Sequence, residues 1–579
     1  KIMKIKHLFG LAVIAAMTAS CSSNEDLGTA GPSTGTNETG VGYATFTINL
    51  PSTSGSTSGA RGTRATGDPT MDEGDPTEYA VKSATALIFQ KYGSDEGSYK
   101  FVESVTLPTA AADWSDDTTE GITTTSKKLV AKLTNVDTKN QYSVLVLLNN
   151  EKTGGVKVEL PTVGQSYNDW NTKVLTPSVA ELAATGDFYM ANAPLNVGAS
   201  PTTLVNIDNS KIYPTEEKAK TLESAATVYV ERGVAKMSVS DPASKTVKDK
   251  ATKVDTKSTV DFSNWALDIT NKKTYAVHNI DGLSTDFSAI WTTARFTGTN
   301  SRVYWGKDPN YENDDLKLTD KDAERQAEFN FINATSEIDK TFAESAYCLE
   351  NTFNLENMYQ GQTTRVIFKA TYTPNDDAGV SLADGDGTFY TIGNMTTILN
   401  TAKLKAAVEA AATAVLPGCT VDYANLETEG SHVITLADIK DATGAALVAG
   451  GDYSGKTGTQ IIDKINDKLG LKDGRAEAKV GINTYKKGVT YYIARVKHFG
   501  DALPWTSGEA YGAENGKYLG RYGMLRNNWY VLEVGNVYGP GYPGVPPVDP
   551  TQPDDENEKY LSVSVKILSW AKWSHSYDL

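Results

Sequence analysis

The sequence predicts an all-β protein with two tandem β-sandwich domains, a few short helical insertions and a separate strand near each end. Short runs that alternate apolar and polar residues recur between turn residues, for example at 364–372 and 529–537. Helical patterns are few, and they do not alternate with strands in the rhythm of an α/β fold. They lie at 321–329, 401–415 and 458–469.

Length and charge limit the number of domains and the classes of partner that the protein can have. The 579 residues allow about two to four domains, at roughly 100–200 residues each. Hydrophobic residues make up 39% of the chain, which is typical of a globular protein. The chain has 55 Lys and Arg against 71 Asp and Glu, a net charge of −16. No nucleic-acid partner is therefore expected, because phosphate binding needs a basic surface.

Residues 1–20 are predicted to be an export signal peptide, with Met3 as the start. Lys4 and Lys6 precede an apolar run of about 12 residues, which is too short to span a bilayer. Small residues and then Cys21 follow this run, so we expect Cys21 to be lipidated. The alternative is an ordinary signal peptide with a cysteine close to its cleavage site.

Residues 21–64 are expected to form a lipidated propeptide that contains one detachable strand. Ala44, Phe46, Ile48 and Leu50 alternate with polar residues, which predicts a half-buried β-strand. Segments of Gly, Ser and Thr flank this strand on both sides, and such segments cannot bury enough apolar surface to fold alone. The strand is thus isolated in the sequence.

A protease site is predicted directly after this strand. Arg61 and Arg64 lie in a loop of small residues, the kind of segment in which proteolysis concentrates. A cut after Arg64 would make Ala65 the new N-terminus. It would also separate the lipid and the isolated strand from the rest of the chain. The alternative is that both arginines are ordinary surface residues.

The body of the protein is predicted to comprise two sandwiches, at 65–240 and 241–538. A polar, lysine-rich stretch at 240–259 has no apolar periodicity and separates them. Residues 539–560 are expected to be a proline-rich, acidic linker. Its first 15 residues hold six prolines and, extended at about 3.1 Å per residue, would reach roughly 45 Å.

The tail, 561–579, is predicted to be a second detachable strand. Leu561, Val563, Val565 and Ile567 alternate with polar residues without a break. A lone strand of this kind tends to aggregate unless it has a partner.

The two ends suggest one mechanism. Removal of the strand at 43–50 would expose a groove between two unpaired strand edges, and the tail of a neighbouring copy could fill it by strand addition. Such head-to-tail contacts produce open filaments. The alternative is that the tail folds back on its own domain.

No catalytic, metal or cofactor site is predicted. The five histidines are scattered along the chain, and 384–388 lacks the ligands that complete a calcium loop of the EF-hand type. Cys348 and Cys419 either form a disulfide or are two buried, apolar side chains.

Several motifs follow one another along the chain. They are the lipobox at Cys21, RATGD at 64–68, VYVERGVAK at 228–236, YWGKDPNY at 304–311, YCLENT at 347–352, RNNWY at 526–530 and the proline-rich tail. In this order they resemble the fimbrillins of Bacteroidales, the major-subunit family of type V pili. The tail is similar to that of the short-fimbria stalk subunits.

This resemblance implies two transthyretin-like sandwiches and a lipoprotein, carrying palmitate, in the outer membrane. It implies cleavage by an arginine-specific protease at Arg64–Ala65, and a homopolymer in which 561–568 is the donor strand. Anchor and tip subunits, a host or bacterial surface receptor and a role in biofilms would follow. Two alternatives remain: an anchor or tip subunit, and a glycan-binding surface lipoprotein that uses some of the 9 Trp and 29 Tyr.

Overall fold

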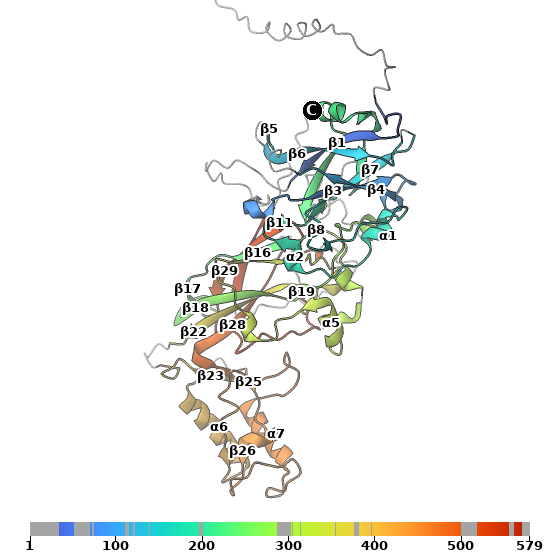
Figure 1. Ribbon diagram of the computed structural model, residues 1–579. Helices are drawn as coiled ribbons and strands as arrows, with labels where there is room; N and C mark the ends of the chain where they lie inside the picture. The colour runs from blue at the N-terminus through green and yellow to red at the C-terminus, as the bar shows by residue number, and fades with distance from the viewer. Residues whose placement is uncertain are drawn as a thin grey trace, which may run out of the picture.

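The computed structural model shows an elongated molecule in which three parts follow one another (Figure 1). The structure describes residues 34–50, 70–71, 74–109, 115–119, 122–137, 139–195, 201–286, 303, 305–312, 314–353, 355–375, 381–394, 397–498, 518–554 and 561–569. The first part contains β1, β7 and β15, the second contains β18, β22 and β29, and the third contains α6 and α7 at the opposite end from β1.

The first part is built on a ten-stranded sheet. Its main path is β4-β3-β7-β12-β15-β1-β6-β5, with β13 beside β7 and β14 beside β1. Every residue of β7 is buried, as expected for an apolar central strand. The strands are β1 (Gly42–Asn49), β3 (Ala84–Gln90), β4 (Lys100–Leu107), β5 (Ser115–Thr119), β6 (Ile122–Leu133), β7 (Tyr142–Leu148), β12 (Met190–Asn192), β13 (Val205–Ile207), β14 (Ile212–Tyr213) and β15 (Ala226–Arg232).

Short elements surround this sheet. They are η1 (Pro76–Glu78), η2 (Glu96–Ser98), α1 (Tyr167–Asn171), α2 (Val179–Leu182), η4 (Asn209–Lys211) and α3 (Glu216–Thr221), with two small hairpins, β8 (Glu151–Lys152) with β9 (Gly155–Val156) and β10 (Ala183–Ala184) with β11 (Asp187–Phe188).

The second part is built on a nine-stranded sheet with the path β2-β30-β29-β17-β18-β22-β28, and with β16 between β21 and β29. The chain enters it directly after β15, across Gly233 and Val234. The strands are β2 (Thr70–Met71), β16 (Ala235–Val239), β17 (Ser244–Lys248), β18 (Asp255–Asp268), β21 (Ser345–Cys348), β22 (Arg365–Thr373), β28 (Val489–Arg495), β29 (Asn528–Val537) and β30 (Leu561–Ser569).

Smaller elements border the second sheet. They are β19 (Thr270–Asn271), α4 (Leu283–Asp286), η5 (Pro309–Tyr311), η6 (Asp314–Lys317), α5 (Asp322–Glu328), β20 (Phe329–Asn330), η7 (Thr335–Glu337), η8 (Leu355–Asn357) and η10 (Lys486–Gly488).

The third part is an insertion with a hydrophobic core of its own. Leu404 and Val408 of α6 (Thr401–Val415) meet Ile461 and Ile465 of α7 (Gly458–Leu469) in this core. Thr457 and Gln460 form a capping box at the start of α7, and Gly470 ends it in the left-handed conformation. The strands are β23 (Phe389–Ile392), β24 (Thr420–Val421), β25 (Gly430–His432), β26 (Ile439–Lys440) and β27 (Ile482–Tyr485), with η9 (Leu436–Asp438) between them.

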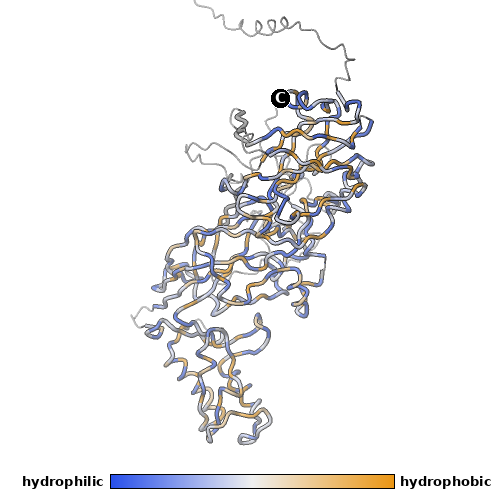
Figure 2. The backbone as a smooth tube through the Cα atoms, in the orientation of Figure 1, coloured by the Kyte–Doolittle hydropathy of each residue, from blue (hydrophilic) through white to orange (hydrophobic). Residues whose placement is uncertain are grey.

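The all-β prediction is confirmed: two large sheets, of ten and nine strands, are the main elements of the first two parts, and apolar residues run through their strands (Figure 2). Helices also form where the sequence predicts them, as α5, α6 and α7. The separate core of the insertion was not predicted, because apolar spacing within each helix says nothing about which other elements it meets.

Buried polar residues join the first two parts. Lys236 of β16 forms an ion pair of 2.7 Å with Glu78 of η1, and both side chains are less than a tenth exposed. The Lys236 ammonium also lies 3.8 Å from the centre of the Trp529 ring. The Arg232 guanidinium donates to the carbonyl of Glu78 and to the side chain of Asn527. Lys236, Arg232, Asn527 and Trp529 all belong to the motifs on which the fimbrillin resemblance rests.

Candidate functional site

Strand β1 lies inside the first sheet, with a neighbour on each edge. It pairs antiparallel with β6 along its whole length, from Gly42 opposite Leu133 to Asn49 opposite Ser126. On its other edge, residues 46–49 run parallel to residues 226–229 of β15, and Tyr43 and Ala44 pair with β14. A segment that ends only two residues before a stretch of Ser, Thr and Gly is thus an internal strand of the sheet.

The four residues predicted to anchor this strand all lie in the hydrophobic core of the first part. Ala44, Phe46 and Ile48 are fully buried, and Leu50, one residue beyond β1, is 6% exposed. Burial of a large apolar side chain contributes about 1.5–3 kcal/mol. The strand therefore supplies a substantial share of this core.

The polar face of β1 is also covered, which differs from the predicted half-buried strand. Thr45 is 1% exposed, and its hydroxyl donates to the carbonyl of Ala219 in α3. The hydroxyl of Thr47 hydrogen-bonds that of Ser224, and the side chain of Asn49 donates to the carbonyl of Val228. Because α3 contacts β1, removal of the strand would uncover an apolar core on one face and hydrogen-bonding groups on the other.

The predicted tail strand is β30, and it lies on the protein's own second sheet. It pairs antiparallel with β29, and its far end pairs parallel with β2, at Thr70 opposite Leu568. In this structure the tail therefore takes the folded-back arrangement that the sequence left open.

The donor residues hold successive positions along this pairing. Leu561 is 3% exposed, and Val563 packs against the core of the second part. Val565 lies in register with Leu532, and Ile567 with Tyr530. The side chains of Val565 and Ile567, and the sites at Cys21, Arg64 and Ala65, lie outside the described residues.

The two strands belong to different sheets of one chain. Strand β1 supplies core to the ten-stranded sheet, and β30 lies in the nine-stranded sheet. Both carry apolar residues at every second position, so each presents one apolar face. A single chain therefore has one occupied strand position near its N-terminus and one alternating strand at its C-terminus.

Within the described residues, no group of three or more His, Cys, Asp or Glu side chains could hold a metal ion. The acidic loop at 384–388 forms a turn, in which Asp384 bonds Thr401 and Asp386 accepts from the backbone of Thr388. Cys348 and Cys419 are free and lie in different cores, so they do not form a disulfide. Burial raises the pKa of Cys348 to about 12, so its thiol stays protonated.

No helix in the described part of the chain is both long enough and apolar enough to cross a membrane.

Comparison with known proteins indicates a class of protein for part of the chain. Residues 483–576 match the family model described as the major fimbrial subunit protein type IV, fimbrillin, C-terminal. This match covers β28, β29, the proline-rich segment and β30. This region of the chain is therefore similar to the C-terminal part of a structural subunit of fimbriae. The fimbrillin resemblance drawn from the sequence is confirmed in this region.

Solved structures give weaker likenesses. One is a crystal structure described as a candidate cell adhesion protein from Parabacteroides distasonis, with 11% identity and a TM-score of 0.36 over 92% of this chain and 99% of that one. Another is a fimbrial assembly protein from the same organism, with 11% identity and a TM-score of 0.27 over 57% of this chain and 81% of that one. TM-scores this low do not show a shared fold or function. No curated protein matches the chain significantly.

Proposed function

We propose that this protein is a stalk subunit of a fimbria, in which each copy inserts its tail strand into the site that β1 vacates in the next copy. The observation that carries the proposal is the position of β1, an N-terminal strand that is paired on both edges, fully buried on its apolar face and partly buried on its polar face. In a protein that kept β1, the position between β6 and β15 would stay occupied. A protein that lost β1 would need another strand in that position.

The replacing strand must pair with the edges of β6 and β15 and must fill the hydrophobic core of the first part. Loss of β1 leaves the backbone of β6 and β15 unpaired, and unpaired internal strand edges readily accept another strand. The tail offers Leu561, Val563, Val565 and Ile567 with the two-residue period of Ala44, Phe46, Ile48 and Leu50. Because the donor and the acceptor lie on different sheets, the contact is head-to-tail and the polymer is open.

The export and processing steps complete the proposal. Lipidation at Cys21 would hold the precursor on the outer membrane, and an arginine-specific protease would cut after Arg64, so that Ala65 begins the mature chain. The homopolymer would form the shaft of a cell-surface fimbrium with separate anchor and tip subunits. It would support adhesion and biofilm formation.

The proposal is tested by an Arg64→Ala variant, with Arg61→Ala as its matched control. We expect the parent and Arg61→Ala proteins from cell surfaces to start at Ala65 and to run as a ladder of oligomers on non-denaturing sizing. Arg64→Ala protein should keep its propeptide and remain monomeric. Parent protein that still starts at Cys21 and is found only as a monomer would overturn the proposal and favour an anchor subunit or a glycan-binding lipoprotein.

A further inference from the structure

The proline-rich segment between β29 and β30 is held against the second part along its whole described length. We call residues 539–554 the strap. At its start, the phenol hydroxyls of Tyr492 and Tyr485 donate to the carbonyls of Gly539 and Gly541, both at 2.9 Å. A Cβ atom at Gly541 would lie 2.0 Å from the carbonyl oxygen of Tyr491, so only glycine fits this approach.

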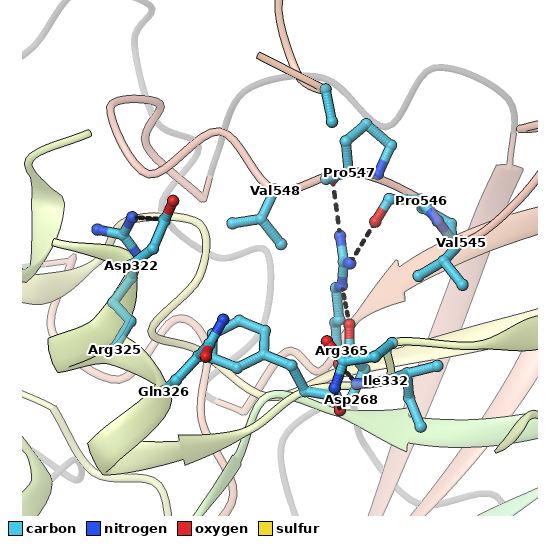
Figure 3. Close-up of a pocket in the computed structure, with 13 residues that line it drawn as sticks. Asp268, Asp322, Arg325, Gln326, Ile332, Arg365, Val545, Pro546, Pro547 and Val548 are labelled. Atoms are coloured by element: carbon cyan, nitrogen blue, oxygen red, sulfur yellow. Dashed lines mark hydrogen bonds and ion pairs between the residues drawn. The ribbon is translucent and has the colours of Figure 1, made fainter. Parts of the chain in front are cut away.

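Further along, the strap pairs with β28 and accepts hydrogen bonds from an arginine. Tyr491 and Tyr542 exchange two backbone hydrogen bonds, of 2.9 and 2.7 Å. Further on, the buried guanidinium of Arg365 donates to the carbonyls of Pro546 at 2.7 Å and Pro547 at 3.3 Å. Figure 3 shows Arg365 reaching from the sheet to these two prolines.

The charge of Arg365 is balanced below the strap, where Asp268 accepts from its Nε at 2.8 Å. A cavity of about 350 Å³ lies beside this arginine, between the strap and α5. Asp268 and Asp322 are the acidic residues of its lining. Asp268 pairs with Arg365, and Asp322 pairs with Arg325 and Arg475.

The end of the strap is fixed as firmly as its start. The backbone of Gln360 donates to the carbonyl of Gln552, and that of Asp554 donates to the carbonyl of Met358, both at 3.0 Å. The Asp554 carboxylate is fully buried and lies 3.4 Å from the Nε of Arg495. A carboxylate buried beside a guanidinium is costly to separate from it.

The strap also covers apolar surface that the sheet alone would leave open. Ile367 and Tyr491 point to the face of the second sheet opposite its main core, and they are at most 1% exposed. Tyr542 and Val545 of the strap pack against them. Removal of the strap would expose the apolar residues on this face of the sheet. The strap is therefore a layer of the fold.

We infer that the strap stays docked when subunits join, so that the transferred donor element begins after Asp554 and not at Gly539. This inference rests on the proposed function. Residues 555–560 then supply the whole connection to the donor strand, and the seven steps from Asp554 to Leu561 span at most about 25 Å at 3.3–3.6 Å per residue. Neighbouring subunits must therefore lie close together, with the acceptor site of one within that distance of Asp554 in the other.

Two disulfide variants separate the strap from the tail. Tyr359 and Pro553 lie directly opposite each other in an isolated antiparallel bridge, so Tyr359→Cys with Pro553→Cys would lock the end of the strap. Glu533 and Ser564 lie opposite each other in β29 and β30, so Glu533→Cys with Ser564→Cys would lock the tail. Each protein is purified, oxidised or reduced, cleaved at Arg64 and sized under non-denaturing conditions.

We expect the oxidised strap lock to polymerise to the same extent as its reduced form, and the oxidised tail lock to lose polymerisation completely until it is reduced. A strap lock that polymerises only after reduction would overturn the inference and leave the proposed function intact. A tail lock that polymerises while oxidised would overturn the proposed function itself. Hydrogen exchange at Tyr491, Tyr542 and Asp554 provides a second readout that needs no disulfide. Their protection should persist in the polymer, and its loss there would contradict a docked strap.

Discussion

At the scale of single residues, the proposed function assigns different side chains to the uncut chain and to the polymer. Ala44, Phe46 and Ile48 fill the first core of the uncut chain. In the proposed polymer, residues of the tail would fill it instead. A substitution in β1 should therefore affect one state of the protein and leave the other unchanged.

Phe46→Ala tests this separation. Phe46 is fully buried, and loss of a buried phenylalanine costs about 3–5 kcal/mol of unfolding free energy because a cavity remains. We expect the uncut precursor to lose that much stability in chemical denaturation. Fimbriae assembled from cleaved Phe46→Ala protein should be as stable as those of the parent, since they no longer contain residue 46. A weakening of both states would contradict replacement of β1.

A second prediction at this scale concerns Glu96. Its carboxylate is turned inward and accepts from the backbones of Thr203 and Leu204 at 3.0 Å. Burial raises the pKa of Glu96 from 4.5 to about 7, although these hydrogen bonds favour the charged form. Between these two values the folded state keeps a proton that the unfolded state releases. The stability from this group is therefore complete below about pH 4.5 and is lost as the pH rises towards 7.

The expected loss is on the order of 1–3 kcal/mol, because Glu96 is only half-buried as a residue and solvent screens part of the effect. Unfolding free energies measured from pH 4 to pH 8 should fall for the parent, and Glu96→Gln should flatten that slope. If the unfolding free energy of both proteins fell equally with pH, the pH dependence would come from groups other than Glu96.

At the scale of elements, alternation in the sequence predicted strands well. The isolated N-terminal strand and β30 both begin within one residue of the expected position. A period of two residues marks a strand whatever its neighbours are, so a single sequence carries this information. Alternation cannot show that α3 would cover Thr45, because that contact joins segments 174 residues apart.

The strap shows the same limit more sharply. Its prolines predict an extended chain, whereas the segment bends at 543–545 and turns at 550–551. Its docking depends on Arg365, Tyr491 and Arg495, which lie in other strands and carry no local sign of their partners. The insertion core is a similar case, since α6 and α7 were predicted one by one and their packing against each other was not. Long-range contacts thus account for most of what the sequence left open.

At the scale of the whole molecule, the proposed function requires that force pass between an acceptor site in the first part and a donor strand in the second. The buried residues at the junction are suited to this task. Glu78 accepts from Lys236, from the hydroxyl of Tyr347 and from the backbone of Asp75, so one carboxylate ties together both parts. We expect stiffness at this junction to depend on these buried charges, because water and salt screen them much less than exposed ones.

Lys236→Met tests the junction directly. It removes the cation and leaves the Glu78 carboxylate, 3% exposed, without its ion pair. Breaking a buried pair in this way costs about 3–5 kcal/mol, whereas removal of both charges costs much less. We expect Lys236→Met to lose that stability in denaturant unfolding, and Lys236→Met with Glu78→Gln to regain at least half of it. X-ray scattering should show a broader range of angles between the two parts in the single variant only. Effects that simply add, with unchanged scattering, would mean that apolar packing alone holds the two parts in line.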